Sequence, residues 1–178
     1  SPRRRGIVSV SRAHEDKKPP VFAGIDEMAE AEDWAYTAIN TPQYSGTIWT
    51  RHILLEKEGF VIVIDDIQAL EDDDYYISNN WHGLGEPSID EEERVWELKK
   101  GSSTFTLKNL KIDNRGPHPQ LFTASYDASE INSWEPFYTQ ALHQQVSYHM
   151  NKGDLYRFAN AFYVRSSGES GLDRKSVV

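Results

Sequence analysis

The segment from Thr47 to Asp66 constrains the fold more than any other part of this sequence. Its first half alternates, so that Trp49 and Leu55 fall on one side of an extended strand. Glu56 to Gly59 then supply charged and glycine residues that suit a tight turn. Phe60 to Ile64 follow as a second extended run, and the whole segment therefore predicts a β-hairpin.

The run from Phe60 to Ile64 is apolar at every position and rich in β-branched residues. Such a run is typical of a middle strand that is covered on both faces. Other short strand-like segments recur between glycine, proline, asparagine and aspartate signals, and we count roughly eight or more. The sequence therefore predicts a mostly β, layered antiparallel sandwich (supersandwich-like) with at most one short helix. We expect one domain over residues 1–178, with flexible ends at about 1–5 and 166–178.

The strand predictions outside the hairpin rest on the same alternation of side chains. Tyr156, Phe158 and Phe162, for example, share one face of an extended segment. The expected strands cover residues 75–77, 95–98, 104–110, 121–126, 144–150 and 156–164.

The one segment that suits a helix lies within Asp26 to Ala38. Met28 and Ala35 belong to a set of residues with helical spacing, and Asp26 suits the position that caps a helix start. The later half also alternates through Trp34 and Ala38, which leaves a strand open as an alternative.

The amino-acid composition limits which classes of molecule this protein can bind and which chemistry it can use. A formal net charge of −9 argues against nucleic acid and anionic lipid as bulk electrostatic partners. The chain has no cysteine, which excludes disulfides, zinc thiolate sites and cysteine nucleophiles. Five tryptophans and nine tyrosines suit either a β core or the stacking of sugar rings.

No complete active site is recognisable in the sequence. Phosphate loops, nucleophile elbows and metalloprotease motifs are absent, and the six histidines lack metal-ligand spacing. Carboxylates are abundant, but no pair stands out as an acid and base. The acidic runs at Asp72 to Asp74 and Asp90 to Glu93 leave calcium binding as an alternative. We therefore expect no catalytic residue, no cofactor and no metal site.

The candidate substrate-binding residues are Asn80, Trp81, His82 and Arg51. The first three adjoin one another and combine an amide, a flat ring and an imidazole, which together suit sugar recognition. The alternative is a core tryptophan beside a histidine that is bonded to backbone. Arg51 interrupts an apolar strand face, so it either pairs internally with Asp65 or Asp66 or contacts a uronate.

Three stretches together resemble the carboxy-terminal β-sandwich of the heparinase II/III-like polysaccharide lyases. These are the arginine-bearing strand from Tyr44 to Leu55, the hydrophobic strand from Gly59 to Asp66, and the aromatic-histidine pair Trp81 and His82. The resemblance covers about forty residues. It implies an α/α toroid joined to a multilayer sandwich, with an anionic polysaccharide bound between them and cleaved by β-elimination.

The sequence departs from that family in what it lacks. No helical hairpins precede residue 40, and no histidine cluster precedes the strand that carries Arg51. Only Arg51 and His82 match family positions, and we expect them to support the fold or the rim of a cleft. We therefore expect an extracellular or periplasmic sandwich module of a larger lyase-like protein, with a polysaccharide as partner and no activity alone. A stand-alone carbohydrate-binding sandwich and a structural domain are the alternatives.

Overall fold

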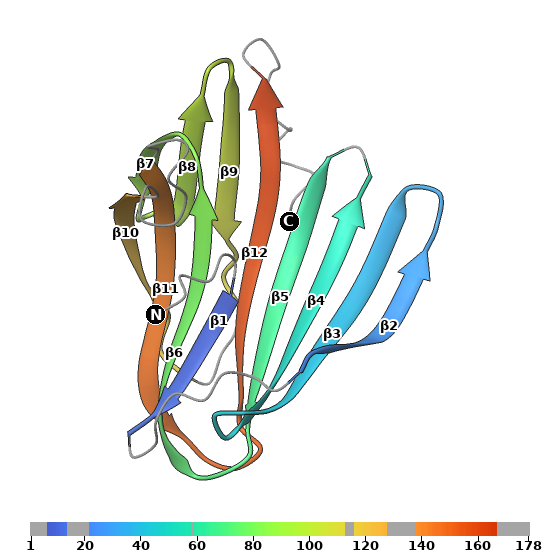
Figure 1. Cartoon of the computed structure of the whole chain (residues 1–178), viewed down its shortest axis with the longest axis vertical. Coiled ribbons are helices and arrows are strands. Elements are labelled where there is room, and N and C mark those ends of the chain that lie inside the picture. The colour runs from blue at the N-terminus through green and yellow to red at the C-terminus, as the bar shows by residue number, and fades with distance from the viewer. Residues whose placement is uncertain (1–6, 14–21, 58, 113–115, 128–137, 167–178) are drawn as a thin grey trace.

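The computed structural model describes residues 7–13, 22–57, 59–112, 116–127 and 138–166. These residues form two antiparallel β-sheets that pack face to face as a sandwich (Figure 1). The predicted all-β sandwich is therefore confirmed. In the described part of the chain no helix occurs, and hence none long and apolar enough to cross a membrane.

The smaller sheet has four strands in the order β1-β6-β11-β10, and the larger sheet has eight in the order β2-β3-β4-β5-β12-β9-β8-β7. The smaller sheet consists of β1 (Ile7–Arg12), β6 (Asp73–Gly83), β11 (Tyr138–Met150) and β10 (Gln120–Asp127). The larger sheet consists of β2 (Gly24–Glu30), β3 (Trp34–Tyr44), β4 (Thr47–Glu56), β5 (Phe60–Ala69), β12 (Leu155–Ser166), β9 (Ser103–Asn109), β8 (Val95–Lys100) and β7 (Glu86–Asp90).

The predicted hairpin is confirmed as β4 and β5, and β5 lies in the middle of the larger sheet between β4 and β12. The expectation that β5 is covered on both faces is wrong for one of them. Val63 and Ile67 are buried against the smaller sheet, whereas Ile62 and Ile64 point outward and are only half-buried. The smaller sheet covers the inner face alone, and no second layer packs on the outer face within the described residues.

Of the two alternatives for Asp26 to Ala38, the helix is wrong and the strand in its later half is confirmed, because this segment forms β2 and the first half of β3. Alternation through Trp34 and Ala38 prevails over the helical spacing, since β3 pairs along its length with β4. The chain turns between the strands, where the Ala31 amide donates to the Trp34 carbonyl at 2.8 Å. A shift in register after Ile25 marks a β-bulge in β2.

The interior contains two apolar clusters, one toward each end of the sandwich. The first holds buried residues of both sheets, including Ile77 of β6 and Phe158 of β12. The second surrounds Trp96 of β8 and includes Leu142 of β11. Burial of these side chains between the sheets is the main source of stability of such a fold.

The chain ends that we expect to be flexible fall mostly outside the described residues. Residues 1–5 are not described, and of residues 166–178 only Ser166 is, as the last residue of β12. Their expected flexibility and the single-domain boundaries therefore stay predictions.

Candidate functional site

Strand alternation divides the four predicted site residues into one pair inside the sandwich and one pair on the outer face of the smaller sheet. Asn80, Trp81 and His82 lie within β6, where successive side chains point to opposite sides. Trp81 therefore points into the sandwich, and Arg51 on β4 also points inward. Asn80 and His82 point outward from the smaller sheet, beside His143 of β11.

The inward pair meets in the interior. The Arg51 guanidinium lies 5.0 Å from the ring centre of Trp81 and 5.2 Å from that of Trp49. Its Nε and Nη2 atoms donate to both oxygens of Asp65, at 2.7 and 3.0 Å. Of the two alternatives for Arg51, the internal ion pair with Asp65 is confirmed. The Arg51 side chain is only 14% exposed, and its contact with the Trp81 ring of β6 reaches the smaller sheet.

Asp65 accepts four hydrogen bonds, and one of them joins the two sheets. Besides Arg51 it accepts from Trp49 Nε1 at 2.8 Å and, across the interface, from Asn79 Nδ2 of β6 at 2.9 Å. The carboxylate is completely buried. A buried charge requires such pairing, because an uncompensated carboxylate in a protein interior is costly.

Further polar side chains extend this contact across the sandwich. Gln144 of β11 and Asn160 of β12 exchange two hydrogen bonds of 2.6 and 3.1 Å, and Asn109 of β9 donates to Asn160. Along β6, β11 and β12 these residues fall between the two apolar clusters. We call this set the buried polar layer: Arg51, Asp65, Asn79, Asn109, Gln144 and Asn160.

The outward pair forms a small network on the surface of the smaller sheet. Asn80 Oδ1 accepts from Ser78 Oγ at 2.7 Å and from His143 Nδ1 at 2.5 Å. The rings of His82 and His143 meet edge to face, with centres 6.5 Å apart. Partial burial lowers the pKa of His143, so this imidazole is neutral at neutral pH.

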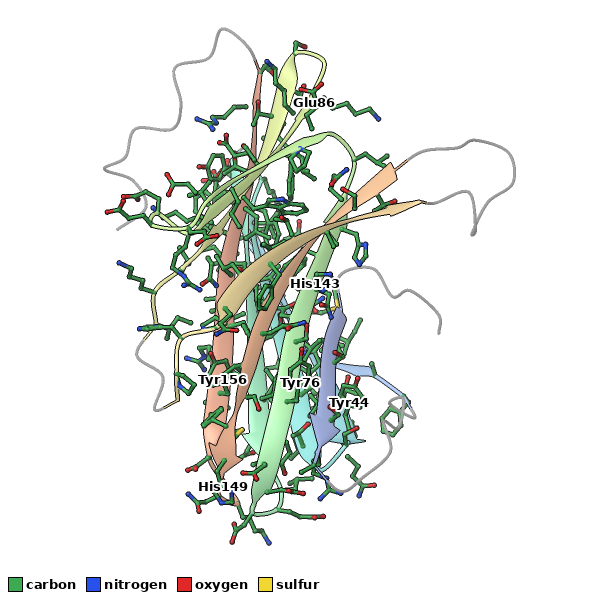
Figure 2. All side chains as sticks on the ribbon, turned by 90° about the vertical axis from the view of Figure 1, so that its left-hand side faces the viewer. Tyr44, Tyr76, Glu86, His143, His149 and Tyr156 are labelled. Carbon is green, nitrogen blue, oxygen red and sulfur yellow. The ribbon has the colours of Figure 1, made fainter. Side chains whose placement is uncertain are left out.

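Two aromatic side chains adjoin this network. Phe122 of β10 lies directly opposite His143 and is 44% exposed. Tyr76 lies farther along the same face of β6, four residues before Asn80 and about 13 Å away along the strand (Figure 2). Stacking surfaces and neutral hydrogen-bonding groups thus lie together, which suits a hydroxyl-rich ligand. We call this set the histidine surface: Tyr76, Ser78, Asn80, His82, Phe122 and His143.

Sequence reasoning missed His143, although a signal for it was present. The strand predicted from Gln144 to Met150 begins six residues too late, because β11 starts at Tyr138. Extending its alternation by one step places His143 on the same face as His149. Pairing with β6 then brings His143 opposite Asn80, a contact that the sequence pattern alone does not reveal.

The acidic run at Asp72 to Asp74 forms local contacts at one end of the molecule. Asp72 accepts from the Lys152 amide at 2.6 Å, and Asp74 pairs with His149 at 3.0 Å. In the described part of the chain, no group of three or more histidine or acidic residues is placed to hold a metal ion.

No protein-family profile and no curated protein sequence matches this chain. Several solved structures do match this chain. The heparan sulfate lyase HepC from Pedobacter heparinus matches with a TM-score of 0.66 and 12% identity over 83% of this chain. A heparinase III gene product matches with a TM-score of 0.67 and 10% identity over 89%, and a further heparinase III with 0.66 and 9% over 93%.

These similarities define the class of fold: the chain has a heparinase-like β-sandwich fold. Identities this low support the fold alone. The matches cover 22%, 24% and 26% of the three solved chains, so this chain spans about a quarter of their length.

Proposed function

We propose that this chain is the carboxy-terminal sandwich module of a longer polysaccharide-lyase-like protein, with an extracellular or periplasmic location. The supporting observation is that nearly the whole chain matches about a quarter of each heparinase chain. The remaining part of such a protein, in this proposal a helical toroid, carries most of the chemistry. The sandwich supports the fold and supplies part of the rim of the substrate cleft.

Within this module the histidine surface is the proposed contact with polysaccharide. Its Asn80 amide and two imidazoles match the hydrogen-bonding groups of sugars, and Phe122 offers a ring for stacking. The buried Ser78 hydroxyl orients the Asn80 amide. Arg51 and Trp81 support this surface from beneath, because Trp81 lies in β6 between Asn80 and His82.

A binding measurement tests this contact. Titration calorimetry with unsulfated uronate-containing oligosaccharides would compare the wild type with Asn80→Ala, His82→Ala and Phe122→Ala. We expect each change to weaken binding by about fivefold to tenfold, since each removes one hydrogen bond or stacking contact. Glu86→Gln, on β7 of the larger sheet, is the control that should bind as wild type. Wild-type affinity in all three variants would rule out the histidine surface as the contact.

The proposal also states that the isolated chain is inactive. β-Elimination needs a base, an acid and a group that neutralises the uronate, and Arg51, the matched cation, is already engaged by Asp65. Incubating the chain with a uronate polymer should therefore give no rise in absorbance from unsaturated product. A sustained rise that scales with protein concentration would contradict the claim.

A stand-alone carbohydrate-binding domain is the second candidate, and the exposure of Phe122 and Tyr76 favours it. The intact mass of the native protein separates the two candidates. A much longer native chain supports the lyase module, whereas a native chain of this length that binds glycan supports the stand-alone domain.

A further inference from the structure

A second row of polar side chains crosses the outer face of the larger sheet, on the opposite side of the sandwich from the histidine surface. It takes one residue from each of four adjacent strands, β3, β4, β5 and β12 (Figure 1). Nothing in the proposed function uses these residues. We call this set the tyrosine row: Tyr36, His52, Asp66 and Arg157.

Contacts connect the row from end to end. The Tyr36 hydroxyl hydrogen-bonds with His52 Nδ1 at 2.8 Å, and the two rings stack with an angle of 17° between their planes. His52 Nε2 lies 3.7 Å from Asp66 Oδ2. Arg157 then donates to both oxygens of Asp66 in a forked ion pair. Each side chain is therefore held in one orientation before any ligand arrives.

The charges of Asp66 and Arg157 balance each other within the row. Burial, and then the nearby Glu27 carboxylate, raise the pKa of Tyr36, so its hydroxyl stays protonated at neutral pH. The hydrogen bond to Asp66 raises the pKa of Arg157, which keeps the ion pair charged. A protonated phenol, an imidazole and an arginine-paired carboxylate, with the Glu27 carboxylate beside them, offer donors and acceptors that suit a neutral, hydroxyl-rich ligand.

An aromatic ring adjoins the row on the same face. Trp34 lies two residues before Tyr36 on β3, about 7 Å along the strand, and it is 38% exposed. Phe60 of β5 holds it edge to face, with ring centres 5.8 Å apart. A fixed and partly exposed indole beside oriented polar groups is the combination that binds a sugar ring by stacking.

The dimensions of the row suit an extended ligand. Neighbouring strands lie about 4.8 Å apart, so four strands spread the row over about 14 Å. Leu54 and Ile62 form a half-buried apolar floor around it, and no layer covers them within the described residues.

We propose that the tyrosine row and Trp34 form a second glycan-binding site, which takes neutral polysaccharide chains lying across β3, β4, β5 and β12. The site is independent of the histidine surface. It selects hydroxyl groups and flat sugar faces in place of sulfate or carboxylate, because Arg157 and Asp66 already neutralise each other.

Nuclear magnetic resonance on the ¹⁵N-labelled chain tests this proposal. The probes are three neutral hexasaccharides, a β-1,4-glucan, a β-1,4-mannan and an α-1,4-glucan, each titrated to millimolar concentration. We expect at least one to shift the indole signal of Trp34. Tyr36→Phe and Trp34→Ala should each weaken that binding by about tenfold. In these variants binding is followed through the backbone amides of β3 and β4, because Trp34→Ala has no indole signal at this position. Dispersed amide spectra would confirm that both variants fold.

Asn80→Ala is the matched control, because it changes the opposite face and should leave this affinity unchanged. The proposal is overturned if none of the three sugars shifts the Trp34 signal. It is also overturned if binding survives both Trp34→Ala and Tyr36→Phe but is lost in Asn80→Ala. The second outcome would at the same time support the histidine surface, so failure of one site is distinguishable from failure of the other.

Discussion

At the scale of single residues, Asp65 is the position on which the contact between the two sheets depends most. It is a fully buried carboxylate that accepts from Arg51, Trp49 and Asn79, and these donors come from both sheets. The Arg51 side chain is itself clamped between two indole rings. A buried pair of this kind contributes less net stability than the cost of losing one partner suggests, because desolvation offsets the attraction.

Arg51→Met should destabilise the protein by about 3–5 kcal/mol, since it leaves the Asp65 charge buried with only neutral donors. Adding Asp65→Asn should recover part of this loss, because the uncompensated charge is removed. Urea unfolding of the two single variants and the double variant measures both effects. A double variant that is less stable than Arg51→Met would contradict this account.

His143 should make stability depend on pH. Its pKa in the folded protein lies below the ordinary value of 6.5, so the unfolded chain takes up this proton first as the pH falls. The contribution is fully present above about pH 6.5 and is lost as the pH falls toward the folded-state pKa. Urea unfolding at successive pH values should show a shallower acid decline in His143→Gln. Ser147→Ala, on the same strand, should keep the wild-type decline.

At the scale of elements, two glycine turns differ in how they tolerate a side chain. Gly85, between β6 and β7, and Gly101, between β8 and β9, both have positive φ, at 143° and 61°. A Cβ at Gly85 would lie 2.7 Å from the Lys99 carbonyl oxygen, whereas nothing lies within 4 Å of one at Gly101. The turn at Gly85 therefore depends on glycine for space as well as for conformation.

Gly85→Ala should lower the free energy of unfolding by about 2–4 kcal/mol, because the backbone must shift to relieve the contact. Gly101→Ala is the matched control, and it should cost only about 1 kcal/mol for its left-handed conformation. Chemical denaturation of both variants gives the comparison. Equal losses would show that the contact with Lys99 is unimportant.

The sequence predicted elements where alternation and turn residues agreed, as in the β4–β5 hairpin and in the strands around Phe105 and Phe158. It left Asp26 to Ala38 undecided between helix and strand, because a few alanines and one methionine there have helical spacing. The decisive factor there is pairing with β4, which is remote in sequence.

The candidate site was harder to predict, because adjacent residues of a strand belong to different faces. Asn80, Trp81 and His82 suggest one cluster when the segment is taken as a strand end, but they lie inside β6 and divide between surface and interior. The buried polar layer did leave a signal. Asn79, Gln144 and Asn160 each interrupt an alternating apolar face, and their mutual contacts emerge only from the pairing of distant strands.

At the scale of the whole molecule, net charge and surface chemistry together bear on the choice of ligand. The chain carries a charge of −9, and the histidine surface contains no lysine or arginine. The tyrosine row contains one arginine, which is paired with Asp66. Long-range forces should therefore repel a sulfated polymer, and binding should rest on short-range contacts.

Affinity for a neutral glycan should change less than twofold between about 0.02 M and about 0.5 M salt, since no counterions are released. Affinity for heparan sulfate should stay weak at low salt. Calorimetric titrations of both ligands at the two salt concentrations measure this contrast. Tight heparan sulfate binding that salt abolishes would reveal a basic strip elsewhere in the protein.

The buried polar layer has a consequence for how the two sheets sit on each other. An interface made only of apolar side chains permits one sheet to shift slightly over the other, because one methyl contact replaces another at little cost in free energy. The bonds from Asp65 to Asn79 and from Gln144 to Asn160 are directional and allow no such slippage. We expect this layer to fix one alignment of the two sheets. The relative positions of the groups on the two outer faces should therefore stay constant.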